Sequence, residues 1–358
     1  MKNIVLKTPR GKRTVGPNQP AFIIAEMSGN HNQKYDQALK IIDAAARAGA
    51  DAIKLQTYTA DTLTIDCDNK YFQVNTNNAW KGQGLYGLYK KAYTPWEWQP
   101  KLKKYAESKG LVCFSTPFDD TAVDFLEKIN VPMYKIAGYE FVHIPLLKKV
   151  ASTKKPVIVS VGYPSLQEIN LCVTTLMKNG AGGIAVLHCS TTYLKNPNLE
   201  DLKLGMIKDI AKKFNVVTGF SDNNAGIEGP IMAVVAGASI IEKHLTLKRS
   251  DGGPDADFSI EPDELKEMTA KIRQIEKSFS SVNYAKKSEG YYKQLHPTIF
   301  AVKNIKKGEQ FTSDNTRVIR PGYGLESKYY FKVLDKTSKK EIKRGTPLKK
   351  QYIRRFGR

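Results

Sequence analysis

Eight short apolar runs recur along the chain, separated by stretches whose apolar residues follow a helical period. The runs are Phe22–Met27, Ala52–Tyr58, Leu111–Pro117, Met133–Gly138, Val157–Gly162, Ile184–Ser190, Val216–Asp222 and Ser239–Thr246. The clearest helical stretches are Gln37–Gly49, Thr121–Ile129, Leu146–Ala151, Leu166–Lys178 and Asp263–Ser278. Alternating strands and helices of this number predict an α/β fold, a TIM (β/α)8 barrel.

Most of the apolar runs end on residues that can perform polar chemistry. These are Glu26, Lys54, Gln56, Ser115, Thr116, Lys135, Ser160, His188, Ser221, Asp222, Glu242, Lys243 and His244. The strands of a parallel barrel all direct their carboxyl ends toward one mouth. We therefore expect these groups to form one site.

The connection after the second run is unusually long, because about forty residues separate Tyr58 from the next helical stretch near Trp96. It is rich in aromatic residues, namely Trp80, Tyr86, Tyr89, Tyr93, Trp96 and Trp98. Two interpretations stay open at this point. The connection is either a small helical excursion packed by its own aromatic side chains, or a wall of the substrate site.

The pattern changes after residue 278, where the long apolar runs and helical periods end. We predict a barrel domain over residues 1–278, a polar linker over residues 279–296 and a small, mostly β domain over residues 297–358. The last domain is too small to enclose a broad core. We expect it to lean on a barrel, either its own or that of a partner.

Composition and charge narrow the classes of function. The chain has 358 residues, 41% of them hydrophobic, and a net charge of +21. The lysines are scattered and accompany no nucleic-acid recognition motif, so a solvated basic surface or steering of anionic small molecules is favoured over nucleic-acid binding. No apolar stretch resembles a signal peptide or reaches the roughly 20 residues of a membrane span. The four cysteines show no paired spacing, and we expect a cytoplasmic protein with reduced thiols.

Short motifs in this order resemble the sialic acid synthase family across nearly the whole chain. They are Ile24-Ala25-Glu26, Gly29-Asn30-His31, Asp51-Ala52-Ile53-Lys54-Leu55-Gln56, Phe114-Ser115-Thr116-Pro117-Phe118, Tyr134-Lys135-Ile136, Glu242-Lys243-His244 and Gly253-Pro254-Asp255. The tail from Ile299 to Ile353 resembles that family's antifreeze-like (SAF) domain. The strings Trp80-Lys81-Gly82, Leu85-Tyr86 and Thr94-Pro95-Trp96 look most like the pseudaminic acid synthase branch.

The resemblance implies a transferase that condenses phosphoenolpyruvate with an N-acylated amino-sugar aldehyde, giving a nine-carbon 2-keto acid and phosphate. The implied catalytic residues are Glu26, Lys54, Lys135 and Glu140. The two lysines, with Thr116, Ser160 and Ser221, are also the cations and donors that the phosphate and carboxylate of phosphoenolpyruvate require. Gln56, Tyr193 and Asp255 are expected to contact the sugar or to fix neighbouring side chains.

The resemblance also implies a divalent metal, Mn²⁺ or Mg²⁺, which would polarise the aldehyde. His244 is the expected ligand, but the family's second histidine is replaced by Asn223 in the string Ser221-Asp222-Asn223. An amide oxygen is a harder and usually weaker ligand than imidazole for transition metals. Two further departures are Gly138, where the family commonly has serine, and His296-Pro297, where it usually places an arginine that reaches the partner's sugar.

Several alternatives remain after these comparisons of residues. His188 stands where the pseudaminate branch usually has lysine, so an N-acetylneuraminate or legionaminate synthase is an alternative. His31 and His143 are interpreted as structural. A different class of function, a degenerate paralogue that binds an anion without condensing it, is favoured by Asn223 and Pro297. We expect an active homodimer in which each C-terminal domain caps the partner's site, with no nucleic acid or membrane involved.

Overall fold

The eight predicted runs form a closed parallel barrel in a computed structural model, which describes residues 3–75, 80–190, 193–194, 197–279 and 290–356. The strands are β3 (Phe22–Glu26), β4 (Ala52–Thr57), β5 (Val112–Pro117), β6 (Tyr134–Ile136), β7 (Pro156–Gly162), β8 (Gly183–Ser190), β9 (Val217–Asp222) and β10 (Ile240–His244). Hydrogen bonds join them in the order β10-β3-β4-β5-β6-β7-β8-β9 and close the ring. The predicted TIM barrel is confirmed.

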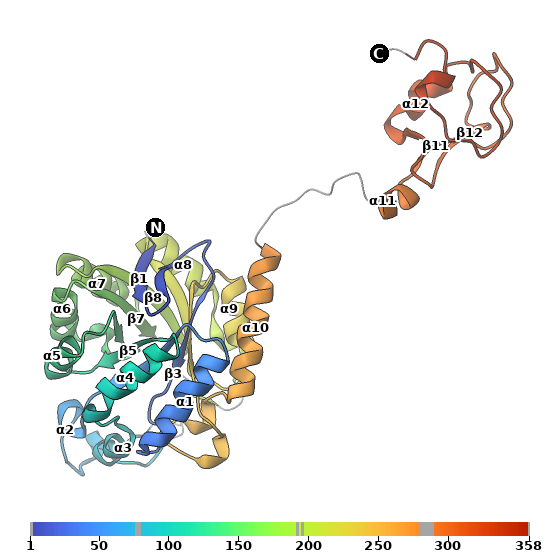
Figure 1. Ribbon diagram of the computed structural model, residues 1–358. Helices are drawn as coiled ribbons and strands as arrows, with labels where there is room; N and C mark the ends of the chain where they lie inside the picture. Colours follow the sequence, from blue (N-terminus) through green and yellow to red (C-terminus); the bar gives the residue numbers. More distant parts are fainter. Residues whose placement is uncertain (1–2, 76–79, 191–192, 195–196, 280–289, 357–358) are drawn as a thin grey trace. The chain divides into compact units, whose positions relative to one another are not determined.

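Helices surround the barrel (Figure 1). They are α1 (Tyr35–Arg47), α4 (Gln99–Ser108), α5 (Asp120–Lys128), α6 (Ile144–Ser152), α7 (Leu166–Lys178), α8 (Gly205–Phe214), α9 (Glu228–Val235) and α10 (Pro262–Phe279). Their ends follow local chemistry. Helix α7, for example, starts in a capping box in which Ser165 Oγ accepts from the Glu168 N–H at 3.2 Å and the Glu168 carboxylate accepts from the Ser165 N–H at 2.8 Å.

A hairpin that the sequence analysis did not predict closes the amino end of the barrel. It consists of β1 (Ile4–Thr8) and β2 (Gly11–Val15), which pair antiparallel. Its side chains Ile4, Leu6 and Val15 join a buried cluster with apolar residues from the inner face of the barrel. The contact with the barrel is close, because a Cβ at Gly183 would lie 3.2 Å from Ile4 Cγ1.

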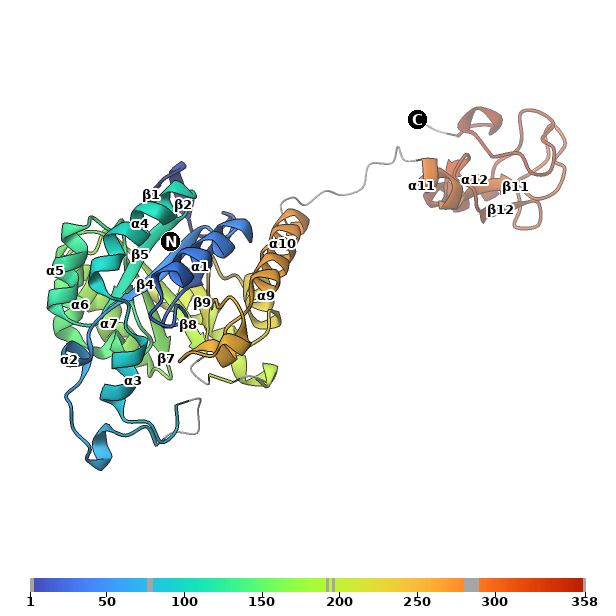
Figure 2. The same ribbon diagram turned by 60° about the horizontal axis from the view of Figure 1, so that its bottom comes forward.

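The long connection after β4 covers the opposite end of the barrel, where Figures 1 and 2 place α2 and α3. It contains α2 (Ala60–Leu63), α3 (Leu85–Ala92) and single 3₁₀ turns at Lys70–Phe72 and Trp96–Trp98. We call residues 60–92 the excursion; residues 76–79 within it lie outside the described residues.

The C-terminal part is a separate unit, since the chain divides into Met1–Ser280 and Ser281–Arg358. Strand β11 (Thr298–Ala301) pairs antiparallel with β12 (Thr316–Ile319) and β13 (Leu325–Glu326), next to helix α12 (Tyr330–Leu334). The unit encloses a small core of its own, formed by Ile299, Ala301, Ile305, Phe311, Leu325, Val333, Ile342, Leu348 and Ile353.

The segment predicted as a linker, residues 279–296, contains a short helix, α11 (Gly290–Leu295), that its polar sequence did not indicate. Residues 280–289 of that segment lie outside the described residues. Among the residues that are described, no helix combines the length and apolar character that a membrane span needs.

Candidate active site

The carboxyl ends of the barrel strands surround a cavity of about 430 Å³. Its lining includes most of the predicted site residues, namely Lys54, Gln56, Lys135, Glu140, Ser160, Tyr193, Ser221, Asn223, His244 and Asp255. Glu26 and Thr116 do not line the cavity, but both contact Lys54 from behind it. The fold therefore brings the whole predicted set together from positions spread over residues 26–255.

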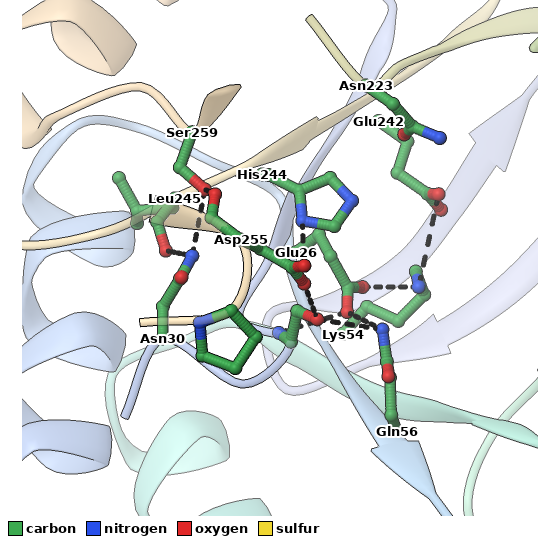
Figure 3. A network of polar contacts seen from close by, with 12 residues as sticks. Glu26, Asn30, Lys54, Gln56, Asn223, Glu242, His244, Leu245, Asp255 and Ser259 are labelled. Carbon is green, nitrogen blue, oxygen red and sulfur yellow. Dashed lines mark hydrogen bonds and ion pairs between the residues drawn. The ribbon is translucent and has the colours of Figure 1, made fainter. Parts of the chain in front are cut away.

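Buried charges of both signs form the centre of this site (Figure 3). Lys54 Nζ pairs with Glu26 Oε2, lies 3.9 Å from Glu242 Oε1 and donates to Thr116 Oγ1 at 3.2 Å. Lys135 Nζ lies 3.1 Å from the same Glu242 oxygen. The charged side chains of this centre are at most 5% exposed. Glu242 is thus held between two ammonium groups.

The protonation states at this centre follow from the balance of burial and charge. Burial opposes the ionised form of Glu242, but Lys135 and Lys54 outweigh it and lower the pKa of this carboxyl. At Glu26 burial prevails over Lys54 and raises the pKa. Burial, together with repulsion from Lys54, lowers the pKa of Lys135. The lysines thus share one firmly ionised carboxylate, and an anionic ligand in the cavity would complete their neutralisation.

A chain of hydrogen bonds extends from Glu26 toward the other side of the cavity (Figure 3). Gln56 Nε2 donates to Glu26 Oε1 at 3.1 Å and to Ser28 Oγ at 2.9 Å. The Ser28 hydroxyl donates to Asp255 Oδ2, and His244 Nδ1 lies 3.7 Å from that oxygen. The chain fixes the directions of Gln56 and Asp255, both of which face the cavity.

Burial also shifts the pKa values of Glu140, Asp255 and His244, which line the cavity. Burial raises the pKa of Glu140 to about 6 and that of Asp255 to about 6. Burial, with repulsion from Lys54, lowers the pKa of His244 to about 3. At neutral pH the imidazole is therefore uncharged, while both carboxyl groups change their charge slightly below neutrality.

Several buried polar atoms beside the cavity have no hydrogen-bond partner among the described residues. Ser160 Oγ and Glu140 Oε2 are two of them, and Glu242 Oε2 and His244 Nδ1 are others. Ser160 is 1% exposed and comes from the inner face of β7, whereas Glu140 begins the short 3₁₀ turn Glu140–Val142 after β6. An unsatisfied buried polar atom is costly, so both are available to a polar ligand.

The excursion supplies an aromatic and aliphatic wall for the same cavity. Trp80 Nε1 donates to the Pro254 carbonyl at 2.6 Å, and its ring centroid lies 4.8 Å from that of Tyr193. Leu85, Leu88 and Tyr89 of the excursion line the cavity as well. Of the two interpretations of this segment, the substrate wall accounts for these contacts, although Tyr89 also packs edge-on against Tyr58.

The residues present provide a small set of donors for a divalent cation. His244 Nδ1 is buried without a hydrogen-bond partner among the described residues, and the neutral imidazole offers a lone pair. Asn223 lines the same cavity and donates through Nδ2 to Cys189 Sγ at 3.6 Å. No cluster of three or more His, Cys, Asp or Glu suited to a metal occurs in the described part of the chain. A cation here would need water or substrate oxygens to complete its shell.

Some polar residues at the strand ends face away from the cavity. Side chains alternate along a strand, so Asp222, Lys243 and His188 lie on the outer side of the barrel wall. His188 Nε2 is 2.7 Å from the Leu202 carbonyl. The expectation that every polar strand end faces the mouth is therefore wrong for these residues. His188 therefore does not contact a ligand bound in this cavity.

Three other polar residues serve the local structure. His31 Nε2 is 3.0 Å from Thr94 Oγ1, and His143 Nδ1 accepts from the first turn of α6 at 3.2 Å. Ser115 Oγ is 2.6 Å from Thr57 Oγ1, outside the barrel interior.

The sequence analysis placed Glu242 among the polar strand ends of the expected site but gave it no role of its own, and it did not single out Ser28. Glu242 stands two residues before His244 on one strand, so strand alternation places both on the inner face. Ser28 lies in a loop and follows no periodic signal; only the folded geometry shows that it joins Gln56 to Asp255.

Comparisons with known proteins agree with the resemblance of the motifs. Residues 41–284 match the NeuB family, and residues 296–354 match the SAF domain. The pseudaminic acid synthase of Campylobacter jejuni subsp. jejuni serotype O:2 is 38% identical over 333 residues, which cover 93% of this chain and 96% of that protein. The N,N'-diacetyllegionaminic acid synthase of the same strain is 34% identical over 327 residues, covering 90% of this chain and 97% of that protein.

A solved structure extends this similarity to the fold. The N-acetylneuraminic acid (sialic acid) synthetase of Leptospira borgpetersenii serovar Hardjo-bovis, crystallised with citrate, is 32% identical and superposes with a TM-score of 0.70. The match covers 80% of this chain and 93% of that one.

Proposed function

The chain belongs to the NeuB family, and from this premise we propose that it condenses phosphoenolpyruvate with an N-acylated amino-sugar aldehyde. The products would be a nine-carbon 2-keto acid and inorganic phosphate. The observation that carries the proposal is the buried pair of lysines, Lys54 and Lys135, on either side of Glu242 at the cavity. Two ammonium groups with one firmly ionised carboxylate suit an anion with several charges.

Phosphoenolpyruvate would occupy the side of the cavity formed by Lys54, Lys135 and Ser160. Its phosphate and carboxylate would accept hydrogen bonds from the ammonium groups and from the unpartnered Ser160 hydroxyl. Ser221 would contribute a donor by giving up its 3.0 Å hydrogen bond to Glu242. Gly138 also lines the cavity but has no side chain to donate, so the side-chain donors proposed for phosphoenolpyruvate are those of the two lysines, Ser160 and Ser221.

The proposed reaction has two bond-forming steps. C3 of phosphoenolpyruvate attacks the aldehyde carbon, which leaves an alkoxide on the sugar and an oxocarbenium-like centre at C2. Water adds to C2 and loses a proton, and the tetrahedral carbon then expels phosphate to give the ketone. The lysines stabilise the departing phosphate, while proton transfers at the alkoxide and at water need carboxyl groups.

Glu140 is the group that we assign to the attacking water. Its carboxyl lines the cavity beside Lys135, and burial places its pKa at about 6, within reach of a general base at neutral pH. Glu26 would act on the aldehyde end of the sugar through Gln56 and Lys54, which it contacts and which line the cavity. Gln56, Asp255 and Tyr193 would orient the sugar hydroxyl and acyl groups.

His244 and Asn223 would hold Mn²⁺ or Mg²⁺ if the cation binds. A cation there supplies a Lewis acid that polarises the aldehyde oxygen. The neighbouring Asp255, whose Oδ2 lies 3.7 Å from His244 Nδ1, would orient the imidazole by accepting from the Nδ1–H, which leaves the Nε2 lone pair for the cation.

The acceptor that we propose is the precursor of pseudaminic acid, a 2,4-diacetamido sugar. The apolar wall formed by Trp80, Leu85, Leu88 and Tyr89 suits N-acetyl methyl groups, and the relative with 38% identity is a pseudaminic acid synthase. N-acetylneuraminate or legionaminate synthesis is the alternative, supported by the relative with 34% identity. We further propose a cytoplasmic homodimer with a swapped C-terminal domain; light scattering that gives a monomer would refute the dimer.

The test of this function is phosphate release from phosphoenolpyruvate with a panel of 2,4-diacetamido and 2-acetamido hexoses. Each sugar is assayed with Mn²⁺, with Mg²⁺ and after chelation. We expect release that requires both sugar and metal, with the fastest turnover on a 2,4-diacetamido sugar. Equal release without sugar would contradict a condensation.

A second candidate function rests on Asn223, which weakens the metal site. It is an anion-binding protein that no longer condenses. In that case no sugar would give phosphate release, although phosphoenolpyruvate would still raise the melting temperature. The variant Asn223→His separates the two hypotheses further, because a better ligand should raise Mn²⁺ affinity about tenfold if Asn223 belongs to the metal site.

A further inference from the structure

A buried ion pair lies on the outer side of the barrel wall, directly behind the candidate active site. Lys243 is fully buried and Asp222 is 2% exposed, and Lys243 Nζ donates to Asp222 Oδ2 at 2.7 Å. Neither side chain lines the cavity. A buried ion pair adds little net stability, because desolvation offsets the attraction of the charges. The pair therefore calls for an explanation other than stability.

The pair is the hub of a hydrogen-bond network that reaches beyond the strands. Lys243 Nζ also donates to the Asn224 carbonyl, while Asp222 Oδ1 accepts from Ser190 Oγ at 3.0 Å and from the Asn224 N–H at 3.1 Å. Asn224 Nδ2 in turn donates to Ser190 Oγ at 3.0 Å. The network thus joins the ends of β8, β9 and β10.

The same network holds the residues next to Tyr193. The Leu194 N–H donates to Asn224 Oδ1 at 3.0 Å, and the Ala225 N–H donates to the Leu194 carbonyl at 3.0 Å. Tyr193 itself has a φ of 53°, in the left-handed region that a residue with a side chain enters only at a cost. These hydrogen bonds maintain the backbone that directs Tyr193 against Trp80.

The strand register connects the pair to the candidate metal ligands. Lys243 and Asp222 are directly paired residues of β10 and β9. His244 and Asn223 each follow one member of the pair, and both line the cavity. The positions of the His244 and Asn223 side chains in the cavity wall therefore depend on the ion pair.

We propose that Lys243 and Asp222 are positioning residues that fix Asn223 and Tyr193 for the acceptor sugar and its cation. This inference rests on the proposed function for its kinetic part. We expect the ion pair to have little effect on the side of the cavity proposed for phosphoenolpyruvate. Lys54, Lys135 and Ser160 stand on other strands. Ser221 and Glu242 are held by the hydrogen bonds between β9 and β10. Asn223 and Tyr193 instead follow the strand ends, where the network replaces the ladder.

The test uses the full-length protein and two variants that disturb the network at different points. Lys243→Met removes the ammonium group of the ion pair. Asn224→Ala preserves the ion pair but removes the hydrogen bonds to Leu194 and Ser190. Arg273→Met is the matched control. It breaks a 2.9 Å ion pair with Asp51 at the amino end of β4. Asn224→Ala keeps the proposal falsifiable if Lys243→Met does not fold.

Three quantities are measured in each protein. They are hydrogen exchange at the Leu194 amide, Mn²⁺ affinity by calorimetry, and the KM values for phosphoenolpyruvate and for the best sugar. In Lys243→Met and Asn224→Ala we expect faster Leu194 exchange, about tenfold weaker Mn²⁺ binding and about a tenfold higher sugar KM, with the KM of phosphoenolpyruvate within about twofold. Arg273→Met should change none of them.

Two results would overturn the inference. One is Leu194 exchange equal to that of the wild type in both variants; the other is an equal rise in both KM values, which indicates general loosening. If the wild-type protein turns over no sugar, the proposed function fails, and Leu194 exchange and Mn²⁺ affinity decide the positioning role on their own.

Discussion

The two ends of the barrel use the same strands for opposite purposes. At the amino end the inner face presents apolar side chains such as Phe22 and Ile240, which pack against Leu6 of the hairpin. At the carboxyl end the same strands present Glu26 and Glu242, together with lysines, around a cavity. Both ends are buried, but the inner face of the carboxyl end carries polar atoms that have no hydrogen-bond partner among the described residues, such as Ser160 Oγ.

The difference shows how stability and function are divided along each strand. Apolar burial, worth about 25 cal/mol per Å², stabilises the amino end. Buried charges at the carboxyl end are costly to desolvate and stabilise the fold weakly. Substitutions at the two ends should therefore have separable effects on stability and on catalysis.

The largest effect on catalysis is expected from Lys135→Met at the carboxyl end. Removing an ammonium group that would bind the phosphate or carboxylate should lower kcat/KM for phosphoenolpyruvate at least about 10³-fold. Glu242 keeps Lys54 as a partner, 3.9 Å away, so the protein should still fold. Phosphate release and a melting curve measure the two effects; a near-normal rate in a folded variant would contradict the assigned anion site.

At the amino end, Leu6→Ala should show the reverse pattern. Leu6 is 2% exposed within the apolar cluster, and its truncation should lower the free energy of unfolding by about 2–4 kcal/mol. Neither KM should change at a temperature where the variant is folded. Urea unfolding combined with steady-state kinetics tests this; altered kinetics in the folded variant would show that the two ends are not separable.

The variant Glu140→Gln should have a smaller effect that depends on pH. With a pKa of about 6, Glu140 becomes a base as the pH rises through 6, so the wild-type rate should rise there. The variant should lose this limb of the profile and about 10²-fold in kcat.

The ionisation of Glu140 should affect stability in the opposite direction from activity. Because folding raises the pKa of Glu140 from 4.5 to about 6, its contribution to stability is greatest at low pH and is lost as the pH rises through 6. Glutamine cannot ionise, so Glu140→Gln should be more stable than the wild type at pH 7. Melting temperatures at pH 5 and 7 measure this, and Asp255→Asn, at a second carboxyl with a pKa of about 6, serves as the comparison.

The smallest effect is expected from His188→Gln on the outer side of the wall. Its ring contacts the Leu202 carbonyl and does not line the cavity, so kcat and both KM values should stay within about twofold of the wild type. A changed preference between 2,4-diacetamido and 2-acetamido sugars would show that the outer layer affects the choice of acceptor.

The strands could be predicted because, in a chain of this size, continuous apolar runs bounded by polar residues rarely form anything other than buried strands. Each strand begins and ends within two residues of its predicted run. The hairpin was missed because Ile4–Leu6 is a run of only three apolar residues, too short to stand out before the barrel gives it a surface. Helix α11 was missed because its six residues carry no period.

The sequence predicted which residues belong to the site, but not which way all of their side chains point. Knowing that polar residues end the strands locates Lys54, Lys135 and His244, whereas the alternation of side chains decides that Lys243 faces outward. The contacts of Ser28 and Trp80 depend on loops whose paths no local pattern determines. The roles that we assign to these residues remain proposals for the experiments above.

The excursion also has a consequence for protein engineering. It is one contiguous insertion between β4 and α4, it supplies the apolar wall through residues such as Leu88 and Tyr89, and none of the buried lysines at the anion side belongs to it. Exchanging residues 60–92 between relatives would thus transplant the apolar part of the cavity wall as a single cassette, while Gln56, Tyr193 and Asp255 would stay with the recipient barrel. The side proposed for phosphoenolpyruvate would be inherited unchanged.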